Sequence, residues 1–285
     1  MLPTVRLMKS REMIDCLMEI GQRDSAFALC ANPNCNDCVT QRSDLRREPF
    51  VSESFSVAVS ARLAGETVDA IVNGCRSAEI TTVELDYLDD KPIDVLDSQH
   101  LASVVRGLRL EGLNVASLRG AASEGDSVQC IKLASVCGVG RVVVPLLGDI
   151  KAAALAGADA GVNVSFYNAG TTSDAVLSSM QSLRADGQMA GLTFSAANFV
   201  GVGERPFIKS YLNKLKRFID QLDVEDCTFN GVNTPLAGGN AEIKELVSIL
   251  RCSNFSGQLT LGAGNHEVST LRSTVVQFEN LLLSM

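Results

Sequence analysis

The stretch that decides the fold runs from residue 127 to residue 168 and reads SVQCIKLASVCGVGRVVVPLLGDIKAAALAGADAGVNVSFYN. It contains one pattern twice: a helical run with periodic apolar residues, a glycine, and a short run rich in β-branched residues. Gly138 and Gly161 fall between helix and strand in the two copies. Glycine is favoured just past the C-terminus of a helix because it adopts positive φ without a steric clash. The stretch therefore predicts two successive helix–strand units with parallel strands.

The same unit recurs on both sides of this stretch, with Gly112, Gly187 and Gly257 in the same place. The predicted strands cover residues 54–60, 81–87, 114–120, 141–147, 162–168, 189–195, 224–230 and 258–264. The predicted helices cover residues 66–77, 98–111, 127–137, 150–158, 173–185, 205–222, 241–252 and 267–283. Eight such units favour an α/β fold of the closed (β/α)8 TIM-barrel type. The alternative, an open doubly wound sheet, would need a glycine-rich phosphate loop after the first strand, and SARLAGE at residues 60–66 has a single glycine.

The composition narrows the classes of partner. The chain has 285 residues and a net charge of −8, so a nucleic-acid backbone would be repelled on average. No apolar run reaches the roughly 18 to 20 residues of a membrane span, and no apolar segment of a signal peptide follows the N-terminus. We therefore expect a cytoplasmic protein that binds neither nucleic acid nor membrane. Cysteines within apolar helix patterns agree with a reducing compartment.

The first fifty residues differ from the rest. Residues 10–29 have helical spacing, and a turn-rich stretch and a charged linker follow. We expect residues 1–50 to form an N-terminal helical extension packed on the barrel, and residues 51–285 to form the barrel itself. The spacing of Cys30, Cys35 and Cys38, with Cys16 upstream, is compatible with thiolate ligands for a metal, and free thiols are the other interpretation.

Catalytic groups of such barrels lie at the carboxyl ends of the strands, so the candidate site can be read from eight short stretches. Glu84 and Asp86 are two residues apart on the second strand and point the same way. His266 follows the eighth strand, whereas His100 starts a helix on the outer ring and is expected at the surface. These considerations make Glu84, Asp86 and His266 the candidate catalytic residues. The candidate substrate-binding residues at the other strand ends are Arg119, Tyr167, Asn168, Ser195, Asn198, Asn230 and Asn233.

Three stretches resemble the xylose-isomerase-like superfamily of TIM barrels, which includes sugar-phosphate isomerases and epimerases and apurinic-site endonucleases. They are NTPLAGGNAEIKELVSILRCSNFSGQLTL at residues 233–261, GLTFSAANFVGVGERP at residues 191–206, and VSFYNAGT at residues 164–171. The resemblance covers roughly residue 55 to the C-terminus. In the first stretch, the turn PLAGGN would either cradle a phosphate with its backbone amides or serve as a connecting loop.

The resemblance implies a divalent-metal site whose ligands this chain has exchanged for other side chains. Tyr167 and Ala169 stand at the fifth-strand Glu and His positions, and Ser195 and Asn198 stand at the sixth-strand Asp and His positions. The seventh-strand H-x-x-D pattern reads from Cys227 to Asn230, and the terminal Glu position is Gly262. We therefore expect no metal and no other cofactor.

Three functions remain open at this point. The first is a non-metal barrel that binds a small carbohydrate, polyol or sugar phosphate through the amides and hydroxyls of its strand ends. The second is a metal-independent isomerase or epimerase that uses Glu84 or Asp86 with His266 for proton transfer. The third is a structural or partner-binding barrel. A homodimer is compatible with each of them.

Overall fold

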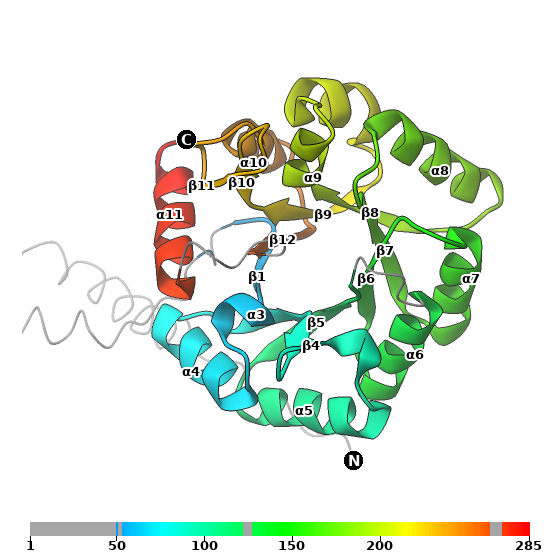
Figure 1. The fold of residues 1–285 in the computed structure, drawn as a ribbon, viewed down its shortest axis with the longest axis vertical. Helices are drawn as coiled ribbons and strands as arrows, with labels where there is room; N and C mark the ends of the chain where they lie inside the picture. The colour runs from blue at the N-terminus through cyan, green and yellow to red at the C-terminus, as the bar shows by residue number, and fades with distance from the viewer. Residues whose placement is uncertain (1–49, 51–52, 122–126, 263–269) are drawn as a thin grey trace, which may run out of the picture. The chain divides into compact units, whose positions relative to one another are not determined.

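The computed structural model describes residues 50, 53–121, 127–262 and 270–285. The chain divides into two compact units, residues 1–47 and residues 48–285, and the first lies outside the described residues, together with the predicted helical extension. In the second unit eight parallel strands form a closed barrel in the order β1-β12-β9-β8-β7-β6-β5-β2 (Figure 1). The strands are β1 Ser56–Ser60, β2 Thr82–Leu85, β5 Asn114–Arg119, β6 Arg141–Pro145, β7 Asn163–Tyr167, β8 Gly191–Ser195, β9 Ile219–Val224 and β12 Gln258–Leu261. The predicted (β/α)8 TIM barrel is confirmed.

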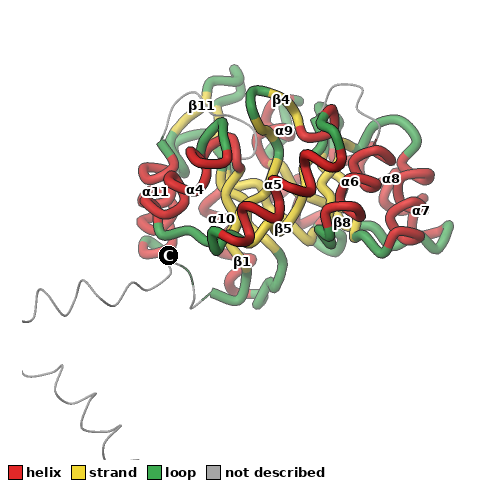
Figure 2. Tube along the Cα trace, turned by 90° about the horizontal axis from the view of Figure 1, so that it is seen from below, coloured by secondary structure: helices red, strands yellow, loops and turns green. Residues whose placement is uncertain are grey.

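Helices surround the strands, as Figure 2 shows from the side. They are α3 Ala61–Ala64, α4 Val68–Ala78, α5 Ser98–Leu110, α6 Ser127–Cys137, α7 Ile150–Ala160, α8 Ser173–Ala185, α9 Ala196–Gly201, the π-helix η2 Pro206–Leu215, α10 Ile243–Cys252 and α11 Leu271–Leu283. A short 3-10 helix, η1, covers Ile93–Val95. Two small hairpins, β3 Tyr87–Leu88 with β4 Lys91–Pro92 and β10 Asp226–Cys227 with β11 Asn233–Thr234, follow barrel strands β2 and β9. β4 and β11 lie at the same end of the barrel in Figure 2, which is the carboxyl end of the strands.

Local signals place the helix ends. Gly112, Gly138, Gly161 and Gly187 all have positive φ after their helices, as the sequence predicted. Gly257 differs, because Asn254 takes the left-handed conformation after α10 with a φ of 52°. A Cβ at Gly257 would come within 2.3 Å of the Asp220 carbonyl oxygen, so that glycine permits a close approach of two backbones.

The apolar core lies between the strands and the helices. Outward-facing strand residues such as Phe166 and Phe194, and helix residues such as Ile71, Leu108 and Phe278, are fully buried members of this one core. Burial of this continuous shell is the main favourable contribution to folding. Among the helices described, none combines the length and the apolar character needed to cross a membrane.

The seventh strand of the barrel, β9, lies earlier in the chain than the sequence predicted. The predicted helix 205–222 is replaced by the π-helix Pro206–Leu215, and β9 covers Ile219–Val224. The predicted strand 224–230 is instead the start of the β10–β11 hairpin. Leu215, Phe218 and Leu222 have the spacing of one helix face, which explains the wrong helix prediction. The correction brings different side chains to the carboxyl end of the barrel.

Candidate functional site

Polar side chains fill the inside of the barrel. On the strands they alternate with buried apolar residues that face the helices. Such groups are stable away from water only when they are hydrogen-bonded to one another. We call the connected set the polar column, and it consists of Glu84, Ser117, Arg119, Gln221, Asp223, Gln258 and Thr260.

Glu84 is the centre of the polar column. Its fully buried carboxylate accepts hydrogen bonds from Ser117 Oγ at 2.7 Å and from Gln221 Nε2 at 2.8 Å. Arg119 Nε lies 2.5 Å from the other oxygen, Oε1. Both oxygens of this predicted catalytic residue are therefore engaged by protein donors.

Arg119 connects two carboxylates. Besides its bond to Glu84, its Nη2 lies 2.5 Å from Asp223 Oδ1, and its guanidinium lies over the Tyr167 ring at 5.1 Å from the ring centroid. Burial lowers the pKa of the guanidinium, but the negative charges of Asp223 and Glu84 outweigh burial and raise that pKa above its usual value. Arg119 is therefore charged at every accessible pH.

Asp86 lies near Arg119 and Glu84, and both Asp86 and Asp223 are in low-dielectric surroundings. Burial raises the pKa of Asp86 to about 6, although a hydrogen bond from Ser60 Oγ at 2.7 Å and one from the Arg62 backbone N–H at 3.2 Å lower it. Burial also raises the pKa of Asp223, with a further contribution from the charge of Glu84, while Arg119 lowers it. These carboxyl groups therefore hold protons much closer to neutral pH than a solvated aspartate does.

Asp223 and Glu225 were missed by sequence reasoning, because the seventh strand was predicted too late in the chain. The stretch QLDVE at residues 221–225 does carry the signal, since its polar residues alternate with Leu222 and Val224. In a sheet with one face in water, the apolar residues face the core and the polar residues face water. In this strand the polar residues face the inside of the barrel instead. The seventh barrel strand, β9, and the residue that follows it therefore bring the carboxylates of Asp223 and Glu225 to the carboxyl end of the barrel. From this strand the sequence had predicted only a cysteine and amides there.

Tyr167, Asn168 and Ser195 lie together where β7 and β8 end. Asn168 is fully buried, and its amide both donates to the Ser195 carbonyl and accepts from the Ser195 N–H, each at 3.1 Å. Ser195 Oγ donates to Glu225 Oε1 at 3.2 Å. Burial raises the pKa of Tyr167 to about 12, so this phenol stays protonated. Asn168 thus joins two strands, whereas Tyr167 and Ser195 face the same cluster as Arg119 and Asp223.

The remaining predicted residues lie farther out. Asn198 is half-buried in α9, and Asn230 is exposed in the turn between β10 and β11. His100 is exposed at the start of α5, as expected, and His266 lies outside the described residues. Asn230 therefore does not lie with the polar column, while the role of His266 stays a prediction.

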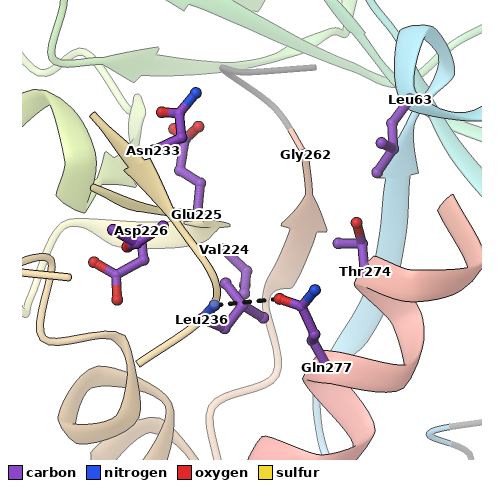
Figure 3. A pocket seen from close by; sticks show the side chains of 10 residues that line it. Leu63, Val224, Glu225, Asp226, Asn233, Leu236, Gly262, Thr274 and Gln277 are labelled. Carbon is purple, nitrogen blue, oxygen red and sulfur yellow. Dashed lines mark hydrogen bonds between the residues drawn. The ribbon is translucent and has the colours of Figure 1, made fainter. Parts of the chain in front are cut away.

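Asn233 lines a small pocket between the β10–β11 hairpin and α11 (Figure 3). Glu225 and Asn233 lie on one side and Thr274 and Gln277 on the other, with Gln277 Oε1 accepting from the Leu236 N–H at 3.3 Å. The pocket holds about 60 Å³, which is small beside the roughly 300 to 1,000 Å³ of ordinary ligand-binding clefts.

The PLAGGN turn is occupied from within the chain. Asp226 accepts hydrogen bonds from the Gly239 and Ala241 backbone N–H groups, both at 2.9 Å. A Cβ at Gly239 would lie 2.3 Å from Asp226 Oδ1, so the glycine makes room for this carboxylate. Two of the amides that would bind a phosphate are therefore already paired, which favours the interpretation as a connecting loop.

The described residues do not fit the divalent metal that the resemblance implies. Within residues 53–121, 127–262 and 270–285, no three His, Cys, Asp or Glu side chains are grouped so that they could hold a metal ion. Tyr167 contacts Arg119, and Asp223 is paired with it. A divalent cation needs about three or more convergent donors, and the carboxylates here are already engaged by Arg119 and by other protein donors. Cys30, Cys35 and Cys38 lie outside the described residues.

The closed barrel, with its candidate site at the carboxyl ends of the strands, defines this chain as a (β/α)8 protein with the fold of the xylose-isomerase-like barrels. A xylose isomerase domain protein from Planctomyces limnophilus is similar with a TM-score of 0.60 at 13% identity, over 81% of this chain and 96% of that one. A xylose isomerase-like TIM-barrel protein from Mycobacterium smegmatis, in complex with magnesium, has a TM-score of 0.61 at 12% identity, over 81% and 97% of the two chains. Endonuclease IV from Thermus thermophilus has a TM-score of 0.55 at 16% identity, over 81% and 100%.

These likenesses confirm the resemblance in fold. No protein-family model matches the sequence, and neither does any curated protein. Since one fold supports many chemistries, function has to be argued from the side chains of this chain.

Proposed function

We propose that the carboxyl end of this barrel binds a small uncharged sugar or polyol without a divalent metal. The observation that carries the proposal is the buried cluster in which Arg119 pairs with Glu84 and Asp223 beside Asp86 and Tyr167. Buried charges are costly to keep, and they gather where binding or chemistry needs them. The cluster lies at the barrel end where (β/α)8 proteins bind their ligands.

The chemistry of the cluster suits hydroxyl groups. Asp86, Arg119 and Tyr167 keep 6%, 7% and 7% of their surface exposed, so a ligand above them would meet a carboxyl, a guanidinium and a phenol. A sugar hydroxyl both donates and accepts hydrogen bonds, and therefore complements all three.

Charge favours an uncharged ligand over a sugar phosphate. Glu84, Asp86 and Asp223 bring three carboxyl groups, and the one guanidinium among them is already paired twice. A phosphate would add negative charge to a region with an excess of it. The sugar-phosphate ligand that the sequence left open is thus the less supported choice.

The test is isothermal titration of the full chain with a panel of aldoses, ketoses, polyols and their phosphates. We expect saturable binding of an uncharged member, at least about tenfold weaker in Asp86→Asn, since a lost charged hydrogen bond costs about 1.5 to 3 kcal/mol. Asp159→Asn, which changes an exposed aspartate on α7, should bind as the unchanged chain does. Binding of phosphorylated members alone, or no binding across the panel, would contradict the proposal, and the second result would favour a structural or partner-binding barrel.

One observation favours the second function, a metal-independent isomerase or epimerase. Asp86 has a pKa near 6 at the barrel mouth and therefore suits a general acid or base at neutral pH. Glu84 is less suited, because it is fully buried and held by four donors. Incorporation of deuterium from heavy water into a bound sugar, lost in Asp86→Asn while binding persists, would support it. Binding without any exchange would count against it.

A further inference from the structure

The carboxyl end of this barrel carries positive charge on a protein side chain. The resemblance implies metal ions at the carboxyl end, and the similar protein from Mycobacterium smegmatis was crystallised with magnesium. In this chain a guanidinium lies among carboxylates at the same end of the barrel.

The position of Arg119 follows from the strand order. In the closed ring, β5 and β9 are four strands apart in either direction, so they face each other across the barrel. Arg119 is the last residue of β5, and its Nη2 lies 2.5 Å from Asp223 on β9. The side chain therefore spans the barrel interior, and its Nε also binds Glu84 on the neighbouring strand β2.

We infer that Arg119 is a tethered cation, which supplies from within the chain the positive charge that a bound divalent ion would otherwise bring to this end of the barrel. The inference concerns the protein without ligand and does not depend on the proposed sugar binding.

Burial and charge support this inference. Glu84 and Asp223 are 0% and 1% exposed, and an unpaired carboxylate at such a position is unstable. Arg119 is the basic side chain that contacts both among the described residues. Arg141 pairs with Asp220, which precedes Gln221 and Asp223 on β9 and thus lies toward the amino end of the barrel. Arg119 also contacts Tyr167, the residue that the resemblance places at a metal-binding glutamate position.

The test is to remove the guanidinium and ask whether a metal replaces it. We expect Arg119→Met to be less stable than the unchanged chain in EDTA, and to gain a saturable rise in Tm with Mn²⁺ that EDTA reverses. Electron paramagnetic resonance of free Mn²⁺ should show about one ion bound per chain of this variant. The unchanged chain and Arg119→Lys should show neither effect. Mn²⁺ suits the test because it prefers carboxylate oxygens to thiols, so the cysteines do not interfere.

Arg141→Met is the control, because it also removes an arginine from an Arg–Asp pair of the barrel, here a half-buried one, and it should lose stability without gaining Mn²⁺ binding. If Arg119→Met folds in neither EDTA nor Mn²⁺, the double variant Arg119→Met/Asp223→Asn decides. Recovery of folding in that variant supports a role through charge, whereas a second failure shows a role through packing and overturns the inference. Mn²⁺ binding by the unchanged chain that is lost in Asp223→Asn would also overturn it, as would an Arg119→Met variant that is folded and indifferent to Mn²⁺.

Discussion

Asp86 shows how a single residue is altered by the inside of this barrel. The hydrogen bonds from Ser60 Oγ and the Arg62 backbone N–H do not replace the hydration that this carboxyl group loses on burial, so its neutral form is favoured. The folded chain therefore holds a proton at Asp86 up to a pKa of about 6, against 3.8 for the free side chain.

This proton affinity predicts a pH-dependent stability. Between pH 4 and pH 6 the folded state binds more protons at Asp86 than the unfolded state does, so the free energy of unfolding falls as the pH rises through this window. The stabilisation from this raised pKa is fully present below about pH 4, and the loss amounts to about 3 kcal/mol by pH 8. Urea unfolding from pH 4 to pH 8 should therefore show a shallower decline for Asp86→Asn than for the unchanged chain. Parallel curves for the two proteins would contradict this prediction, and Asp159→Asn provides the control for a carboxylate in water.

At the same scale, sequence reasoning found some members of the site and missed others. Five residues could be assigned to strand ends because their strands have strongly apolar outer faces. They are Glu84, Asp86, Arg119, Tyr167 and Ser195. Asp223 was missed because the spacing of Leu215, Phe218 and Leu222 favoured a helix where β9 lies. Its pairing with Arg119, 104 positions away, could not be foreseen from local sequence.

At the scale of elements, the chain could be divided correctly wherever glycine and N-cap signals bound a helix. Ser127–Cys137 and Ser173–Ala185 match their predicted bounds at both ends. The π-helix Pro206–Leu215 could not be predicted, because its hydrogen bonds skip one more residue than those of an α-helix and no composition signals that choice.

Two glycines inside helices predict opposite effects of one substitution. In α7, a Cβ at Gly157 would lie 2.3 Å from Val164 Cγ2, so the helix packs directly on β7. In α5, a Cβ at Gly107 would meet no atom within 4 Å. We expect Gly157→Ala to lower the free energy of unfolding by about 1 to 3 kcal/mol through overpacking. Gly107→Ala should raise it by up to about 1 kcal/mol through helix propensity.

Urea unfolding of the two variants and the unchanged chain measures both effects. Equal shifts of the same sign for Gly157→Ala and Gly107→Ala would show that the contact between α7 and β7 is looser than described.

At the scale of the whole molecule, the barrel has two interiors with different roles. The apolar shell between strands and helices provides most of the stability, whereas the polar column inside the ring contributes charge and hydrogen-bonding groups. The ring is closed by β1 pairing with both β12 and β2, so residues 48–285 contain every strand of the barrel.

This closure predicts that residues 48–285 fold without the first 47 residues. The shortened chain should show the circular dichroism of a (β/α)8 barrel and one cooperative thermal transition. Its Tm should lie within a few degrees of that of the full chain. An insoluble product or a broad transition would show that the barrel needs the preceding residues, and that the predicted division at residue 50 is wrong.

The link from Arg119 to Asp223 also has a consequence for the order in which the barrel is assembled. Arg119 and Asp223 lie on opposite strands of the barrel, and three complete β–α units separate them along the chain. Glu84 and Arg119 are synthesised before Asp223. Arg119 can therefore pair with Glu84 early, whereas its pairing with Asp223 requires strand β9. The final contact across the ring is thus a late event, because contacts between distant segments follow the closure of the loops between them.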